Sequence, residues 1–231
     1  MAAANIDASV VISGGTGGLG VAVTRAMLDA GWNVVVPYVV AAELKRLPNH
    51  PRLSTIEADL FDAAAAAAVV AVAPAPLRAL VNLVGGFASG GRVHETPIED
   101  FERQFTLNLR PAYLLCAAAL PRMLEAGGGS IVCVSTRAAL RPFSGAAGYI
   151  SSKAAVLAFV DALAAEYTRD GVRANAILPS VIDTPANRAA EPDADHSRWV
   201  SPEEIARVIG FLCSEDAAPT SGAHIPVYGR A

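Results

Sequence analysis

The fold of this chain is decided by the stretch Ser13-Gly14-Gly15-Thr16-Gly17-Gly18-Leu19-Gly20. It follows a short apolar run and precedes a segment of helical length, so it connects a first strand to a first helix. Glycines permit a tight turn and let the backbone approach a pyrophosphate, while the helix N-terminus offers free N–H groups to the anion. The spacing is GxxxGxG and no Gly-Lys-Ser/Thr follows, which disfavours hydrolysis of a nucleoside triphosphate.

Outward from this turn, short apolar runs alternate with segments of helical length. We expect strands over residues 8–13, 32–36, 53–56, 79–84, 130–134, 174–178 and 225–228. We expect helices over residues 18–30, 41–47, 63–73, 98–126, 147–167 and 202–214, and no clear period over residues 179–199. The alternation predicts an α/β fold of Rossmann type, a doubly wound parallel sheet of about seven strands in a three-layer α/β/α arrangement. Because no linker or repeat interrupts it, residues 1–231 are expected to form one domain.

Three local signals set helix boundaries within this pattern. Pro111 lacks an N–H donor and should bend or split the long helix near Asn108. Asp62 is placed to cap the alanine-rich helix, and Ser201 with Glu204 forms a capping box at the last helix.

Composition excludes several classes of protein. Of the 231 residues, 53% are hydrophobic and 17% charged, with a net charge of −4, so no nucleic-acid partner is expected. The first seven residues lack a basic segment followed by an apolar one, and the apolar run over residues 63–73 is too short to cross a bilayer. Three widely spaced cysteines indicate neither a disulfide framework nor a metal cluster. We therefore expect a cytoplasmic protein with no membrane contact and no bound metal.

Tyr149 and Lys153 carry the chemistry that the sequence indicates. Four residues apart, they share one face if the segment is helical. A nearby ammonium favours phenolate, so the pKa of Tyr149 should fall toward neutrality and allow the phenol to donate or accept a proton. A surface Tyr-Lys pair is the plainer interpretation of this motif alone.

The motifs together resemble those of the short-chain dehydrogenase/reductase superfamily. They occur in the expected order and at the expected separations over nearly the whole chain: Gly14-xxx-Gly18-Leu19-Gly20, Asn82-Leu-Val-Gly85, Asn108, Thr136 thirteen residues before Tyr149, and Tyr149-xxx-Lys153. The resemblance implies an NAD(P)-dependent oxidoreductase that transfers hydride between a nicotinamide cofactor and a small carbonyl, alcohol or C=N substrate, with Tyr149 as general acid/base.

The resemblance also implies the residues that hold the cofactor. They are the glycine turn with Gly14, Thr16, Gly18, Leu19 and Gly20, then Tyr38, Asp59 and Leu60 at the adenosine end, Asn82 and Gly85, Tyr149 and Lys153, and Pro179, Ile182 and Thr184 beside the nicotinamide. Ser180 stands where the family has glycine, which leaves the turn after Pro179 open. The second strand ends in Pro37-Tyr38-Val39-Val40, without the Asp typical of NAD sites or the Arg typical of NADP sites. NAD is slightly favoured, unless Lys45 or Arg46 reaches a 2′-phosphate.

The same resemblance implies roles at the reacting end. Thr136 stands where the family has serine and would hydrogen-bond the substrate oxygen, although the neighbouring Ser135 could do so if the strand end shifts. Lys153 would lower the pKa of Tyr149 and bind the nicotinamide ribose. Asn108 would hold a water molecule at the helix kink, in a proton relay to Lys153.

Two further expectations follow from the resemblance. The loop over residues 178–199 and the Gly85-Gly86-Phe87 continuation look similar to the dihydropteridine reductase branch, which implies a quinonoid pterin as an alternative substrate. A non-catalytic dinucleotide-binding sensor is the other alternative. A homodimer or homotetramer is expected, because the family pairs two helices that here carry small apolar faces, with Ala112, Leu115, Ala118 and Ala119 on the first.

Overall fold

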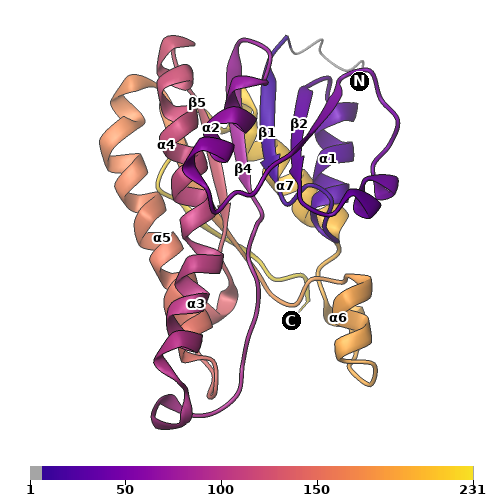
Figure 1. The fold of residues 1–231 in the computed structure, drawn as a ribbon, viewed down its shortest axis with the longest axis vertical. Helices are drawn as coiled ribbons and strands as arrows, with labels where there is room; N and C mark the ends of the chain where they lie inside the picture. The colour runs from indigo at the N-terminus through magenta and orange to yellow at the C-terminus, as the bar shows by residue number, and fades with distance from the viewer. Residues whose placement is uncertain (1–6, 231) are drawn as a thin grey trace.

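Seven parallel strands form one sheet in the computed structural model, which describes residues 7–230. The strand order is β3-β2-β1-β4-β5-β6-β7, so the chain starts in the middle of the sheet and winds outward in both directions. Helices cover both faces (Figure 1). The expected doubly wound α/β/α fold is confirmed.

The elements follow one another in the expected order. The strands are β1 (Ser9–Ser13), β2 (Asn33–Tyr38), β3 (Leu53–Glu57), β4 (Leu77–Asn82), β5 (Gly129–Val134), β6 (Val172–Pro179) and β7 (His224–Val227). The α-helices are α1 (Gly20–Asp29), α2 (Ala63–Ala71), α3 (Ile98–Asn108), α4 (Arg110–Glu125), α5 (Ala147–Tyr167), α6 (Pro185–Ala190) and α7 (Pro202–Cys213). Among the short 3₁₀ helices, η1 (Ala41–Arg46) and η3 (Arg137–Ala139) lie near the site.

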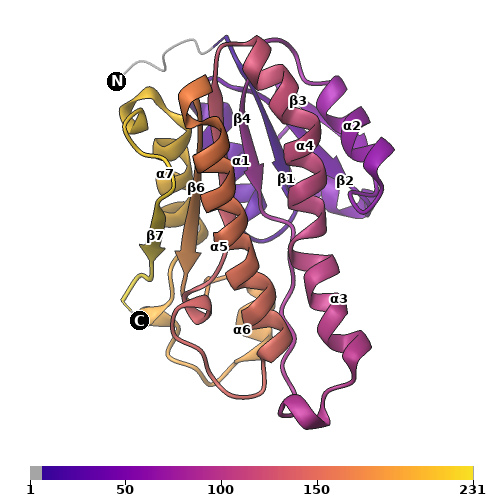
Figure 2. The ribbon, with the colours of Figure 1, turned by 90° about the vertical axis from the view of Figure 1, so that its left-hand side faces the viewer.

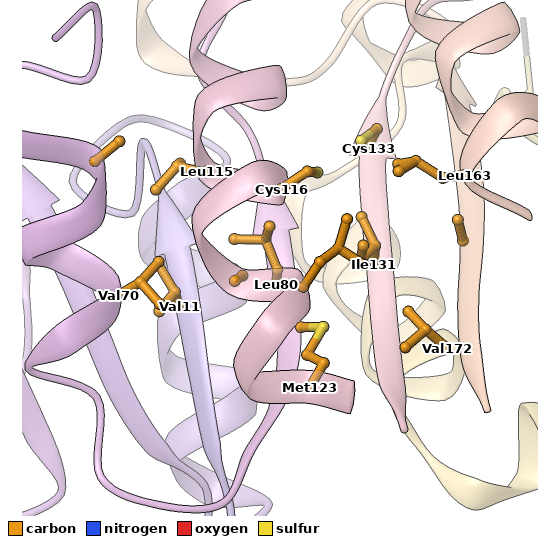
Figure 3. Close-up of a cluster of buried hydrophobic side chains, with 14 of the residues drawn as sticks. Val11, Val70, Leu80, Leu115, Cys116, Met123, Ile131, Cys133, Leu163 and Val172 are labelled. Atoms are coloured by element: carbon orange, nitrogen blue, oxygen red, sulfur yellow. The ribbon is translucent and has the colours of Figure 1, made fainter. Parts of the chain in front are cut away.

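The core divides into two halves because successive strand residues face opposite sides of the sheet. Val11, Leu80 and Ile131 point to the side covered by α2, α4 and α5, where Leu115 and Met123 of α4 pack on them (Figure 3). The neighbouring strand residues, such as Val10 and Ile12, point to the side covered by α1 and α7. Both faces of the sheet are therefore buried, which is why its strands are continuous apolar runs.

The carboxyl ends of the strands build the site. All strands are parallel, so their C-terminal loops gather at one edge of the sheet. In Figure 2 the arrowheads of β6 and β7 point toward this edge, beyond which lie α3, α6 and the first turns of α5. The residues singled out in the sequence lie at these strand ends, on the loops that follow them, or on the helices next to this edge.

The local signals at helix ends are confirmed. The long helix splits at Leu109, between α3 and α4, and Pro111 occupies the first turn of α4. Asp62 accepts a hydrogen bond from the Ala65 N–H, and Ser201 forms the capping box of α7. The stretch without a clear period contains the short helix α6, which the sequence analysis missed. The expectation about the first seven residues falls mainly on residues 1–6, outside the described part.

One expectation about the surface needs correction. Ala112, Leu115 and Ala119 are not on an outer face of α4 but are buried against the sheet. The outer surface there carries larger side chains instead, including Tyr113, which packs on Phe159 of α5 with ring centroids 5.9 Å apart. The reason is helical phase, since α4 turns its small residues toward the sheet to allow close packing.

Helix α5 is long and apolar. Together with the residues up to Asp170, it is the one helix within residues 7–230 that passes a length and hydropathy test for a membrane span, with a mean hydropathy of 1.3. Its Val156, Val160 and Leu163 are buried in the core under the sheet. Core helices of water-soluble proteins pass the same test.

Candidate functional site

The glycine turn closes on itself and on the neighbouring strand. Gly14 has a φ of +69°, a conformation that favours glycine, and its carbonyl accepts a hydrogen bond from the Gly17 N–H at 3.0 Å. A Cβ on Gly20 would lie 2.0 Å from the Gly14 carbonyl oxygen. The N-terminus of α1 has no side-chain cap. The turn is thus shaped to leave a helix N-terminus open to an anion.

The end of β4 lies directly beside this turn. The Leu83 N–H donates to the Ser13 carbonyl and hydroxyl, both at 3.2 Å. Asn82 is 4% exposed, and its Nδ2 donates to the sulfurs of Cys116 and Cys133 at 3.6 and 3.5 Å. Its Oδ1 is buried without a hydrogen-bond partner. Asn82 therefore braces the strand from beneath the site through α4 and β5.

Three segments converge on Gly85. A Cβ at this position would lie 2.6 Å from Asn108 Oδ1 and 2.9 Å from Lys153 Nζ, so glycine permits the approach. Asn108 is buried, accepts from the Gly86 N–H at 2.9 Å and donates to Ser152 Oγ at 3.0 Å. These bonds fix the kink between α3 and α4 against the helix that carries Lys153.

Lys153 lies at the centre of this junction. It is 6% exposed, and its Nζ donates to the Val134 carbonyl at the end of β5, 3.0 Å away. Burial lowers the pKa of Lys153 to about 8, and the charge of Cys133 opposes this shift in part. The sequence contains one other lysine, Lys45, which is exposed.

Thr136 and Tyr149 lie close together beyond the end of β5. The Thr136 side chain lies near enough to the Tyr149 phenol to lower its pKa in part, and its Oγ1 accepts from the Ala138 N–H at 3.2 Å. Ser135 is buried and donates to the Lys153 carbonyl at 2.7 Å. Because adjacent residues of an extended strand point to opposite sides, only one of the two hydroxyls can lie on the side of the Tyr149 phenol. Thr136, and not Ser135, lies on that side.

The pKa of Tyr149 differs from expectation. Burial raises the pKa of this half-buried phenol, and the Thr136 hydrogen bond counters the shift in part. The contribution expected from Lys153 was a lowering. That lowering of the Tyr149 pKa is not seen, because burial has the larger effect and because the Lys153 ammonium is directed at the Val134 carbonyl.

Two phenylalanines lie near the phenol, Phe87 against Tyr149 itself and Phe143 against Phe87. Phe87 packs edge-on against Tyr149, with ring centroids 5.0 Å apart and an interplanar angle of 86°. Phe143 lies 6.4 Å from Phe87, and both phenylalanines are about half exposed or more. From the sequence, Phe87 was expected only as part of a loop, and Phe143 was not expected at the site. A weak signal existed for Phe87, since it follows the paired glycines at a strand end.

The loop after β6 closes the site from the other side. Thr184 caps α6, and a Cβ on Gly18 would lie 2.8 Å from its methyl group, so this loop packs on the glycine turn. Ile182 pairs with Val200 in an isolated bridge. Ser180, where glycine was expected, keeps a negative φ and donates to the Tyr228 carbonyl at 2.8 Å. Serine therefore makes this turn without strain.

The expected adenosine end is more open. Tyr38 ends β2, and its carbonyl accepts from the Ala58 N–H at 2.9 Å. Asp59 is exposed and accepts from the Phe61 N–H at 3.0 Å, whereas the Leu60 side chain lies in the core. Within residues 7–230, no group of three or more His, Cys, Asp or Glu side chains is placed to hold a metal ion.

Known proteins resemble this chain in sequence and in fold. The family model described as "Enoyl-(Acyl carrier protein) reductase" matches residues 14–229. The 2-(R)-hydroxypropyl-CoM dehydrogenase of Xanthobacter autotrophicus is 30% identical over 240 residues, covering 95% of this chain and 96% of its own length. The D-threitol dehydrogenase of Mycolicibacterium smegmatis is 30% identical, covering 95% and 90%. A solved short chain dehydrogenase/reductase family protein is 30% identical, with a TM-score of 0.88 over 99% of this chain and 98% of its own.

The chain belongs to the short-chain dehydrogenase/reductase superfamily. It is an NAD(P)-dependent oxidoreductase, and the expected class of enzyme is confirmed.

The burial of Lys153 leads to a prediction about the free energy of unfolding. Replacing Lys153 with methionine should raise the free energy of unfolding by about 2 kcal/mol at pH 7. Moving the pKa from its ordinary 10.5 to about 8 costs about 3 kcal/mol, and losing the bond to Val134 forfeits about 1 kcal/mol of that gain. Chemical denaturation at pH 7 measures the difference.

The pH dependence of this gain gives the control. Between about pH 8 and pH 10.5 the unfolded chain binds more protons than the folded chain, so wild-type stability rises with pH. The advantage of Lys153→Met should therefore shrink across that range, while exposed Lys45→Met should change stability little at any pH. If the gain in free energy of unfolding by Lys153→Met stays constant from pH 7 to pH 10, burial does not destabilise the charge of Lys153.

Proposed function

We propose that the chain transfers hydride between NAD(P) and a small carbonyl, alcohol or C=N substrate, with Tyr149 as the proton donor and acceptor. The observation that carries this proposal is that α5 presents Tyr149 one helical turn before buried Lys153, whose Nζ lies at the end of β5. In a site of this kind, hydride addition places negative charge on the substrate oxygen or nitrogen, and an adjacent phenol can neutralise it.

The residues present suit a dinucleotide. The open N-terminus of α1 and the glycine turn are shaped for a pyrophosphate, with Thr16, Gly18, Leu19 and Gly20 placed around it. Tyr38, Asp59 and the backbone of Leu60 lie at the ends of β2 and β3, where the adenosine would extend. Pro179 ends β6, and Ile182 and Thr184 lie on the loop after it, which packs against the turn. When bound, NAD(P) supplies or accepts the hydride at its nicotinamide.

The polar groups near the phenol have distinct roles in this reaction. Thr136 donates to the substrate oxygen and stabilises the developing charge. Tyr149 would transfer the proton, and Lys153, which donates to the Val134 carbonyl here, would bind the nicotinamide ribose beside the phenol. With its charge next to the phenol, Lys153 would lower the pKa of Tyr149 from its raised value. Gly85 leaves room for the ammonium, since a Cβ there would lie 2.9 Å from Lys153 Nζ.

An acceptor panel tests this function. NADH and NADPH oxidation is measured with diketones, quinones and a quinonoid pterin, because the dihydropteridine-like loop remains a prediction. Turnover on at least one acceptor is expected, with loss of activity in Tyr149→Phe. Tight cofactor binding without turnover on any acceptor would contradict the proposal and favour the sensor alternative.

We also propose that the chain is a homodimer or homotetramer in solution and a single domain. The surface formed by α3, α4 and α5 supports pairing, because it holds an apolar hollow of about 350 Å³. The hollow is lined by Phe105, Thr106, Leu109, Arg110, Tyr113 and Phe159. Gel filtration with light scattering should give two or four times the chain mass of 23.8 kDa. A monomer at micromolar concentration would contradict this proposal.

A further inference from the structure

The charged residues nearest the glycine turn come from η1 rather than from the end of β2. The β2 terminus and the two residues after it, Tyr38-Val39-Val40, carry no charge, and both valines are exposed. The 3₁₀ helix that follows contributes Glu43 and Arg46. Because β1 and β2 are parallel neighbours, the loops after them meet at the same edge of the sheet.

Glu43 and Arg46 are fastened to one residue of the turn. Thr16 Oγ1 donates to Glu43 Oε2 at 2.7 Å, and Arg46 Nη1 donates to the Thr16 carbonyl at 3.2 Å. The same Nη1 donates to Glu43 Oε1 at 3.1 Å, which closes the three groups into a ring. Thr16 is 5% exposed, whereas the Glu43 side chain is 33% exposed and the Arg46 side chain 50%. A carboxylate therefore lies fixed and accessible beside a site built for an anion.

We infer that this carboxylate selects the cofactor: Glu43 accepts hydrogen bonds from the ribose hydroxyls of NAD and repels the 2′-phosphate of NADP. The inference rests on the proposed seating of the dinucleotide on the glycine turn. A ribose diol is a hydrogen-bond donor and suits a carboxylate acceptor, whereas a phosphate dianion brings like charge to it. Thr16 and the ion pair with Arg46 hold Glu43 in place, so it needs little reorganisation to bind the ribose.

Arg46 gives the inference its sharpest consequence. Its Nη1 is engaged by Glu43 and by the Thr16 carbonyl in the ring, so the guanidinium is held away from a phosphate in the wild-type chain. Removing the charge of Glu43 frees the guanidinium to pair with a 2′-phosphate, for which its donor geometry is suited. Neutralising Glu43 should therefore remove its repulsion of the 2′-phosphate and leave Arg46 free to attract that phosphate.

The test measures the dissociation constants of NADH and NADPH by fluorescence titration on the full chain. Wild type should bind NADH at least about 10-fold more tightly than NADPH, a ratio that corresponds to one favourable charge contact. Glu43→Gln keeps an amide oxygen for Thr16, and it should bind NADPH at least about 10-fold more tightly than wild type while losing affinity for NADH. The double variant with Arg46→Gln should lose the gain for NADPH. Glu203→Gln, an exposed neutralisation on α7, is the matched control and should change neither constant.

The outcomes separate this inference from the proposed function. A purely structural ring predicts that Glu43→Gln weakens both cofactors equally, and that result would overturn the inference. Tighter binding of NADPH by wild type would overturn it too. If neither cofactor binds wild type, the seating on the glycine turn itself is wrong. Thermal unfolding of each variant shows whether it is folded.

Discussion

Replacing Tyr149 with phenylalanine is expected to lower kcat by about 10²- to 10⁴-fold, the usual contribution of one proton-transfer group. The substitution removes one hydroxyl, while the ring can still pack against Phe87. NADH binding and thermal stability should therefore change little. Steady-state kinetics on the best acceptor of the panel, with titration of NADH in parallel, measures both quantities.

Tyr113→Phe is the matched control for this experiment. It removes the same hydroxyl from an exposed tyrosine on α4, away from the site, and should leave kcat unchanged. A Tyr149→Phe variant that retains more than about a tenth of the wild-type kcat would contradict the role of the phenol, since that residual rate corresponds to less than about 1.4 kcal/mol.

Replacing Gly20 with alanine is expected to abolish measurable cofactor binding and to destabilise the fold by about 2 kcal/mol. The new Cβ would lie 2.0 Å from the Gly14 carbonyl oxygen and 2.6 Å from Gly15 Cα, so only a backbone shift can relieve the clash. Alanine is favoured over glycine in a helix by up to about 1 kcal/mol, which is too little to offset this clash. Fluorescence titration with NADH and chemical denaturation measure the two effects.

Gly210→Ala provides the opposite expectation in the same chain. This glycine lies inside α7, and a Cβ there would meet nothing within 4 Å. The substitution should stabilise the fold by about 0.5–1 kcal/mol and leave cofactor binding unchanged. Wild-type affinity for NADH in Gly20→Ala would mean that the turn is not the pyrophosphate site.

The sequence predicted the features that depend on local pattern. The order of elements follows from apolar runs and helix-length segments, and the split at Leu109 follows from Pro111. The glycine turn and the Tyr149–Lys153 spacing are local as well. Helix α6 was missed because a six-residue helix at the start of a polar stretch is too short to show a period.

The features that depend on tertiary contact could not be predicted. That Thr136, and not Ser135, lies on the side of the Tyr149 phenol depends on how the end of β5 packs on α5. The pKa of Tyr149 depends on burial by distant segments, which outweighed a charge four residues away. The ring around Thr16 joins residues 27 and 30 positions apart, beyond the reach of any local pattern.

The central claim is that the glycine turn and the Tyr149–Lys153 pair serve one dinucleotide, and a crystal structure of the complex with NAD⁺ tests it most directly. We predict that the pyrophosphate lies against the N-terminus of α1. We also predict that Lys153 Nζ hydrogen-bonds the nicotinamide ribose and that the Tyr149 hydroxyl faces the nicotinamide. A dinucleotide bound away from the glycine turn, or with its nicotinamide directed away from Tyr149, would contradict the account.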